Sequence, residues 1–366
     1  MKIVIKKSAE GADPVTVAEK PAQDGETVRL TIDAVMQKAA YDSMKGEPGT
    51  AASVDPSTGE VLALVSSPAY NPNEFITGMS GDRYKELEED EKNPMFNRFA
   101  QSYAPGSSLK PITAAIGIEA GTLDPAKGLT INGKTWQKDS SWGAYRVSRL
   151  HEDAPNPIDL NKALIYSDNI YFAQQALAMG RETFEEGLKK YAFGEEIPLD
   201  AMDLTPSQIS NDGKIGSEGQ LADSSFGQGQ MLVNILHLAT MYEPFLTNGT
   251  MYEPVLFLGE EEPKVWKENI LSADTASTIR PLLRNVVKDG YAQSANLPDI
   301  PIAGKTGTAE LKAAGETSGK ENGYFVSFNA DHPSFILAMM VESVEDNGGS
   351  DYVAAMAAEV YRQTAE

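Results

Sequence analysis

The stretch YAPGSSLKPITAA, residues 103–115, joins a break in the chain to two hydroxyls, one amine and an apolar run. Pro105 and Gly106 interrupt the preceding segment, and the apolar run predicts a buried helix. Ser107 and Lys110 are three residues apart, so they share one face of such a helix. Taken alone, this S-x-x-K pattern is weak, because a capping serine and a lysine that reaches water explain it better.

Two further motifs follow in a fixed order. K-T-G occurs once, at residues 305–307, and opens a predicted strand; S-D-N, at residues 167–169, separates two apolar helical runs. S-x-N also matches residues 294–296, in a polar loop, and residues 327–329, which follow K-T-G. Each motif alone is more often a turn, a cap or a strand start. Their order at a helix start, a helix break and a strand favours one common site.

The residue types suit nucleophilic catalysis. A serine hydroxyl such as that of Ser107 is a weak nucleophile until a neighbouring base removes its proton. Lys110 can be that base only if burial or a nearby cation, for which Lys305 is a candidate, lowers its pKa. Ser167 can relay a proton to a leaving group, and Asn169 can hold an amide substrate or orient the lysine.

Backbone groups complete the predicted site. The helix start at Ser107 offers N–H groups and a positive dipole where an oxyanion would form. The strand at Thr308 offers a second N–H and an edge that can pair with an extended peptide. We therefore expect the acyl-transfer centre between the helix start and this strand.

Composition limits the other classes of chemistry. The 366 residues, 41% of them hydrophobic, suffice for one large domain or two ordinary ones. The formal net charge of -22 argues against nucleic acid as a partner. There is no cysteine, no run of about twenty apolar residues, and only three scattered histidines, His151, His237 and His332. We expect no metal, no cofactor and no histidine-based triad.

The order of predicted elements indicates an α/β protein of the α+β type, in which helices flank a mainly antiparallel central sheet. Residues 49–68 read as a hairpin and the strands after residue 300 are joined by short loops, while residues 107–245 form a mainly helical subdomain. Residues 24–44 read as a strand running into a helix capped by Asp33, and two short strands precede them. The closing helix has an apolar face formed by Val353, Met356, Ala357, Val360 and Tyr361.

Together the three motifs are the signature of penicillin-binding proteins and serine β-lactamases. From about residue 24 to residue 366 the chain resembles the transpeptidase domain of class B penicillin-binding proteins, through TVRLTIDAVMQKAA, GTAASVDPSTGEVLALVSSPAYNPNEF, APGSSLKP, FGQGQMLVNILHLATMYEPFLTNG and IAGKTGTAEL. NGKTWQKDSSWGAYRV and GKENGYFVSFN look closest to the low-affinity, methicillin-resistance type. Thr306 stands where that type would have a serine. The resemblance implies the fold shared by penicillin-binding proteins and serine β-lactamases.

The resemblance also implies roles for the motif residues. The implied catalytic residues are the nucleophile Ser107, its general base Lys110, and Ser167. The implied substrate-binding residues are Asn169 on the opposite wall and, around the substrate carboxylate, Lys305, Thr306, Gly307 and Thr308, of which the glycine permits close backbone approach.

The implied activity is peptidoglycan D,D-transpeptidation, with stem peptides as substrates and β-lactams as covalent inhibitors. Family membership further implies a glycosyltransferase partner, an anchored N-terminus, and a place at the outer face of the cytoplasmic membrane in the bacterial cell envelope. We expect residues 26–366 to be the transpeptidase domain and residues 1–25 the remnant of a preceding non-catalytic domain or linker.

Three alternatives share the same motifs. A D,D-carboxypeptidase differs only in that water, not an amine, attacks the acyl-enzyme. A non-catalytic β-lactam sensor would acylate stably and signal through a membrane anchor. A class A β-lactamase needs a glutamate that positions water, and residues 193–213 lack the E-x-x-x-N arrangement typical of it.

Overall fold

The computed structural model describes residues 3–6, 15–19, 23–200, 202–259, 262–311 and 319–364. The chain divides into two units, residues 1–30 and 31–366. In the first unit, strands β1 (Ile3–Lys6) and β2 (Val15–Glu19) pair antiparallel, which confirms the two predicted strands. The turn predicted between them lies outside the described residues, and the assignment of residues 1–25 as a domain remnant stays a prediction.

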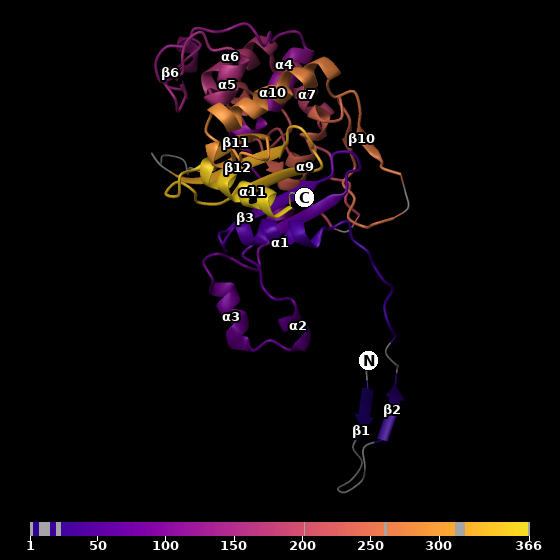
Figure 1. Ribbon diagram of the computed structural model, residues 1–366. Helices are drawn as coiled ribbons and strands as arrows, with labels where there is room; N and C mark the ends of the chain where they lie inside the picture. The colour runs from indigo at the N-terminus through magenta and orange to yellow at the C-terminus, as the bar shows by residue number, and fades with distance from the viewer. Residues whose placement is uncertain are drawn as a thin grey trace. The chain divides into compact units, whose positions relative to one another are not determined.

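The second unit is built around a five-stranded antiparallel sheet (Figure 1). Its strand order is β11-β12-β13-β3-β4, with bounds β11 (Ile302–Leu311), β12 (Lys320–Asn329), β13 (Ile336–Val341), β3 (Gly49–Val54) and β4 (Val61–Ser67). Because β13 pairs with β3, the early hairpin and the late strands meet inside one sheet. The predicted antiparallel sheet from distant parts of the chain is confirmed.

Side chains on the two faces of the sheet enter two separate cores. Along β13, Ile336, Ala338 and Met340 pack into one core while Leu337, Met339 and Val341 pack into the other, as the two-residue period of a strand requires. The second core is completed by α1 (Ala34–Ser43) and α11 (Ser350–Thr364), on one side of the sheet in Figure 1. All five predicted apolar residues of the closing helix are buried.

The first core lies under the helices on the other side of the sheet (Figure 1). These helices are α4 (Lys110–Glu119), α5 (Leu160–Ile165), α6 (Asn169–Met179), α7 (Arg181–Lys190), α8 (Glu218–Ser224), α9 (Ile235–Thr240) and α10 (Ala273–Asp289). The mainly helical centre of the chain is thereby confirmed. None of the helices among the described residues is long and apolar enough to cross a membrane.

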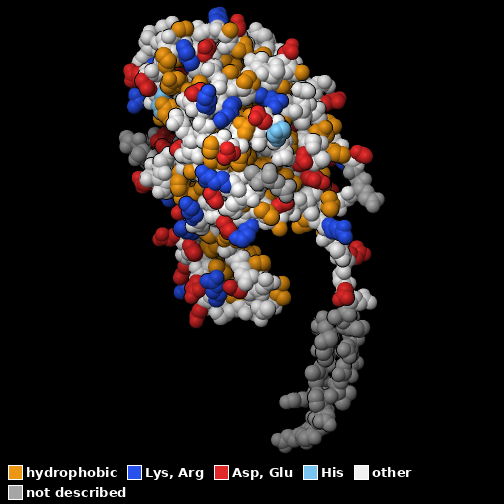
Figure 2. Space-filling model, viewed as in Figure 1, with side chains coloured by type: hydrophobic (Ala, Val, Ile, Leu, Met, Phe, Trp, Pro, Cys, Tyr) orange, Lys and Arg blue, Asp and Glu red, His pale blue; other side chains and the backbone are white. Residues whose placement is uncertain are grey.

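The remaining elements are short. They are α2 (Asn73–Thr77), α3 (Gly81–Glu89), the 3-10 turns η1 (Arg98–Ala100), η2 (Gly106–Leu109), η3 (Ser140–Trp142), η4 (Glu243–Phe245) and η5 (Gln293–Ala295), and the two-stranded pairs β5 (Ser102–Tyr103) with β8 (Val233–Asn234), β6 (Thr135–Trp136) with β7 (Val147–Ser148), and β9 (Met251–Tyr252) with β10 (Val265–Lys267). Figure 2 shows acidic and basic side chains interspersed over the face in view.

One predicted element is wrong. Asp33 caps α1 as expected, accepting hydrogen bonds from the N–H groups of Val35 and Met36, but no strand leads into that helix. Residues 23–30 are exposed, Val28 by 63% and Leu30 by 47%. A β-rich sequence forms a strand only when it finds a partner strand and a surface to cover.

Candidate active site

Ser107 lies in the turn η2, and α4 begins only at Lys110. The sequence predicted both residues on one helix, whereas the turn is closed by the Lys110 N–H donating to the Ser107 carbonyl. Pro111 causes the difference, because it has no N–H with which to make the α-helical bond to that carbonyl. The tighter turn still brings the two side chains together, with Lys110 Nζ 2.8 Å from Ser107 Oγ.

Close backbone packing holds η2 in place. The Gly106 N–H donates to the Gly227 carbonyl at 2.9 Å, and Gly106 has a φ of +55°. A Cβ on Gly106 would lie 2.4 Å from the Thr308 carbonyl oxygen, and one on Gly307 would lie 2.7 Å from the Pro105 carbonyl oxygen. Glycines therefore allow η2, strand β11 and the turn at residue 227 to pack backbone against backbone.

The Lys110 amine is the centre of the polar network. Its Nζ lies 2.8 Å from Ser107 Oγ, 2.7 Å from the Ser167 carbonyl oxygen, 3.1 Å from Ser167 Oγ and 2.7 Å from Asn169 Oδ1. Ser167 sits between α5 and α6 with a φ of +50°, which aims both of its oxygens at the lysine. Asn169 Nδ2 donates to the Ser148 carbonyl at 3.0 Å, which leaves Oδ1 to face the amine.

The hydrogen bonds of a neutral Lys110 amine leave its lone pair free for Ser107. The Ser167 carbonyl and Asn169 Oδ1 can only accept, so they take both N–H groups of a neutral amine. The remaining lone pair is then available to the hydroxyl proton of Ser107. Burial, followed by the charge of Lys305, holds the pKa of Lys110 well below its usual value, while Asp168 opposes the shift. The geometry and the charges together suit a general base.

Lys305 occupies the other side of the Ser167 hydroxyl. Its Nζ lies 3.0 Å from Ser167 Oγ and 3.1 Å from the Thr306 carbonyl oxygen. Burial lowers the pKa of Lys305 to about 7. The two amines thus contact one hydroxyl, which connects the lysines of the first and third motifs through the second.

These groups open onto a cleft of about 360 Å³. Of the predicted site residues, the ones that line it are Ser107, Ser167, Asn169, Thr306, Gly307 and Thr308. Lys110 and Lys305 lie buried behind this surface and reach it through Ser167. The structure therefore brings all eight predicted residues to one place, and their individual roles stay predictions.

Sequence reasoning missed twelve of the residues that line the cleft, and three of these make defined contacts in its wall. His151 and Tyr291 stack with ring centroids 3.6 Å apart, and Gln228 Nε2 donates to the Thr308 carbonyl at 3.2 Å. Gln228 belongs to the stretch FGQGQ, residues 226–230, which in the sequence supported only the family resemblance. The stacked pair joins loops 140 residues apart in sequence, and no local pattern signals such a contact.

Among the described residues, no group of three or more His, Asp or Glu side chains is placed to hold a metal ion. The polar network at the cleft consists of hydroxyl, amide and amine groups from the three motifs. The chemistry that these groups can perform is acyl transfer through a serine ester.

A family model described as the penicillin binding protein transpeptidase domain matches residues 49–362. The chain belongs to this family. The matched range contains the whole five-stranded sheet, the helical layer and the three motifs of the cleft. The predicted membership of the penicillin-binding protein transpeptidase family is confirmed.

Curated relatives carry the same domain. Penicillin-binding protein 3 of Bacillus subtilis is 47% identical over 341 residues, which cover 92% of this chain and 51% of the relative. Peptidoglycan D,D-transpeptidase MrdA of Acinetobacter baumannii is 27% identical over 380 residues, covering 92% of this chain and 54% of the relative. The chain spans about half the length of these relatives.

Solved structures share the fold. Penicillin-binding protein A of M. tuberculosis, as a ceftriaxone acyl-enzyme complex, superposes with a TM-score of 0.81 at 22% identity over 93% of this chain and 80% of that chain. The D,D-transpeptidase domain of a peptidoglycan glycosyltransferase from Eggerthella lenta superposes with a TM-score of 0.78 at 23% identity, over 92% of this chain and 83% of that chain. The predicted fold of a penicillin-binding protein is confirmed.

Proposed function

We propose that this chain is a peptidoglycan D,D-transpeptidase that works through an acyl-enzyme on Ser107. The observation that carries the proposal is the 2.8 Å contact between Ser107 Oγ and a buried Lys110 amine, whose two N–H groups in the neutral state are already taken by the Ser167 carbonyl and Asn169 Oδ1. Family membership and the names of the relatives support the reaction class.

In the acylation step, Ser107 Oγ attacks the carbonyl of the penultimate D-alanine while its proton passes to Lys110 Nζ. The backbone N–H groups of Ser107 and Thr308 stabilise the oxyanion. Collapse of this intermediate breaks the peptide bond, and the leaving D-alanine amine receives a proton from Lys110 through the Ser167 hydroxyl. The product is an ester between the stem peptide and Ser107.

Substrate-binding groups surround this centre. Lys305, with Thr306 and Thr308, binds the terminal carboxylate of the donor peptide, because a cation and two hydroxyls on one strand match its charge and its acceptors. Gly307 leaves room for the backbone of the donor, and Asn169 holds its amide. In the second step an acceptor amine attacks the ester, gives up its proton to Lys110, and Ser107 leaves with that proton restored.

The setting of this reaction is part of the proposal. We place residues 26–366 as the transpeptidase domain, at the outer face of the cytoplasmic membrane, where a glycosyltransferase partner supplies the strands to be cross-linked. On the segments at residues 132–147 and 319–329 we also propose that the chain is closest to the low-affinity, methicillin-resistance type, although Thr306 stands where that type would have a serine and the likeness alone does not set the β-lactam affinity. The second-order acylation rate of the chain by benzylpenicillin, measured beside a susceptible transpeptidase, tests that last point.

Intact-mass spectrometry with benzylpenicillin over minutes to hours tests the proposal, with Ser107→Ala as the control. We expect one lasting penicillin adduct that is absent in the control. An unmodified protein with hydrolysed drug would instead identify a β-lactamase. A donor peptide ending in D-Ala-D-Ala, offered with and without an acceptor amine, then separates transpeptidase from carboxypeptidase, and no turnover of it despite acylation would identify a sensor.

A further inference from the structure

A buried ion pair lies directly behind the second motif. Arg149 Nη1 lies 3.1 Å from Asp168 Oδ2, and the two side chains are only 2% and 1% exposed. Asp168 Oδ1 meanwhile accepts from the Tyr171 N–H at 3.0 Å and caps α6. Both oxygens of the carboxylate are thus engaged, one by the helix that follows and one by the guanidinium.

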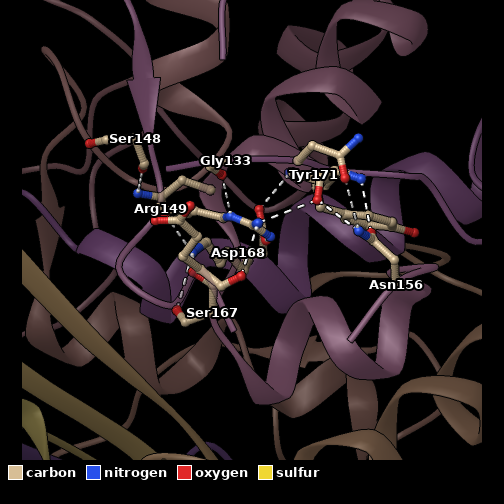
Figure 3. Close-up of polar contacts among 12 residues, drawn as sticks. Gly133, Ser148, Arg149, Asn156, Ser167, Asp168 and Tyr171 are labelled. Carbon is tan, nitrogen blue, oxygen red and sulfur yellow. Dashed lines mark hydrogen bonds and ion pairs between the residues drawn. The ribbon is translucent and has the colours of Figure 1, made fainter. Parts of the chain in front are cut away.

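The guanidinium is anchored at every nitrogen. Nε donates to the Gly133 carbonyl at 2.9 Å, and Nη2 contacts the Ile131 and Glu152 carbonyl oxygens at 3.3 Å each. Figure 3 shows Arg149 pointing at Asp168, with Gly133 on its other side. Planar guanidinium suits this bridging role because its donors point in fixed directions. Arg149 therefore ties the segment before α5 to the start of α6.

Two consecutive residues, Ser148 and Arg149, each contact one of two consecutive residues of the second motif, Asn169 and Asp168. Arg149 holds Asp168, and the preceding Ser148 carbonyl accepts from Asn169 Nδ2 at 3.0 Å. Ser167, one residue before Asp168, has a φ of +50°, a conformation that costs free energy unless its surroundings impose it. Fixing Asp168 and Asn169 together leaves the Ser167 oxygens pointing at the Lys110 amine.

We propose that Arg149 is a positioning residue: its guanidinium fixes Asp168, and with it Ser167 and Asn169, around the Lys110 amine, and balances the carboxylate charge there. The inference rests on the proposed role of Lys110 as the base of acylation. The charged groups that act on this amine come from three sides: Lys305 on β11, Asp168 at the start of α6, and His151 on the loop after β7.

Within the proposal, Arg149 acts on Lys110 through Asp168, whose charge it compensates. Asp168 favours the protonated amine and so raises its pKa. In Arg149→Met, the buried carboxylate loses its compensating charge, and the midpoint of the acid limb of acylation moves to higher pH. In Asp168→Asn, the amide oxygen can still cap α6 while the Arg149 cation is unopposed, and the midpoint moves to lower pH.

The test is the rate of Ser107 acylation by benzylpenicillin, followed by intact mass from pH 5 to 10 in the whole chain. For Arg149→Met we expect a midpoint raised by about one pH unit, hence roughly tenfold slower acylation below the midpoint, with the loss recovered at high pH. Arg149→Lys keeps the charge and should keep the midpoint. Arg149→Met/Asp168→Asn removes both charges and should return the midpoint to that of the wild type.

A matched control removes a buried arginine elsewhere in the fold. Arg98, 2% exposed, pairs with Glu342 at 2.8 Å, away from the lysine network. Arg98→Met should lower thermal stability without moving the midpoint. The inference is overturned if Arg149→Met slows acylation by one factor at every pH, or if the double variant keeps a displaced midpoint. A wild type that forms no adduct would overturn the proposed function itself, which distinguishes the two failures.

Discussion

Replacing Gly227 by alanine should disable acylation without disrupting the fold. Gly227 has a φ of +77°, and a Cβ at this position would lie 2.1 Å from the Gly106 carbonyl oxygen, where real Cβ contacts stay beyond 3.0 Å. The atom in the way is backbone, next to Ser107, so it cannot rotate aside. The two segments must separate by about 1 Å, because neighbouring packed atoms leave no other space.

The size of the effect follows from this displacement. A misplacement of about 1 Å at a reacting group costs on the order of 10²-fold in rate. The left-handed conformation adds roughly 1–2 kcal/mol against folding for any residue with a Cβ. The Gly106 N–H to Gly227 carbonyl bond, 2.9 Å long, is strained by the same movement. The acylation rate of Gly227→Ala should therefore be about 100-fold lower than that of the wild type. Its free energy of unfolding should fall by somewhat more than the roughly 1–2 kcal/mol that the left-handed conformation costs.

Gly213→Ala is the matched control. Gly213 has a φ of +76°, and a Cβ there would meet nothing within 4 Å, so it carries the conformational cost without the clash. Urea unfolding gives the stability of both variants, and intact mass with benzylpenicillin gives their acylation rates. If Gly227→Ala acylates within a few-fold of Gly213→Ala, the backbone contact does not position Ser107 and the reasoning is refuted.

Two pH-dependent predictions follow from buried groups. Lys110 and Lys305 Nζ contact the same Ser167 Oγ at 3.1 and 3.0 Å, so they lie within about 6 Å of each other, close enough for the charge of one ammonium to oppose protonation of the other amine. In Lys305→Met the pKa of Lys110 should rise, and the acid limb of acylation should move to higher pH; an unmoved limb would contradict this. His237 is sealed in the core, donating from Nε2 to the Tyr191 carbonyl at 2.8 Å, and burial lowers its pKa to about 3. In the unfolded chain the His237 imidazole takes up a proton below pH 6.5, whereas in the folded chain it stays neutral. The unfolding free energy should therefore fall by about 1.4 kcal/mol per pH unit between pH 6 and 4. Urea titrations of His237→Gln should lack this contribution to the pH dependence of the unfolding free energy.

Local signals predicted much of the fold. The Asp33 cap, the hairpin at residues 49–67 and the buried face of α11 each depend on residues within one or two turns of one another, so their patterns are complete in the sequence. The strand predicted before α1 failed for the opposite reason. Its β-rich residues are exposed, and no neighbouring sequence could reveal that a partner strand is missing there.

In the site, too, some features follow from local sequence and others depend on contacts between distant residues. Residue types and motif order, together with the resemblance to penicillin-binding proteins, named the eight residues that meet around the cleft. The turn at Ser107 was also decided locally, since Pro111 cannot donate to the Ser107 carbonyl, although the prediction placed Ser107 and Lys110 on one helix. Arg149 and the stacked His151–Tyr291 pair carry no local pattern that distinguishes them from surface residues.

The sequence by itself predicted the candidate nucleophile, the candidate base and the strand that faces them, because these choices reside in short motifs and in turn and helix chemistry. Only the tertiary structure decided what those groups do to one another. Lys110 is separated from Asn169 by 59 residues and Lys305 from Ser167 by 138, and their contacts exist only after the helices close over the sheet. The lowered pKa values of both lysines arise from burial, and burial is a property of the packed chain, which no short segment possesses.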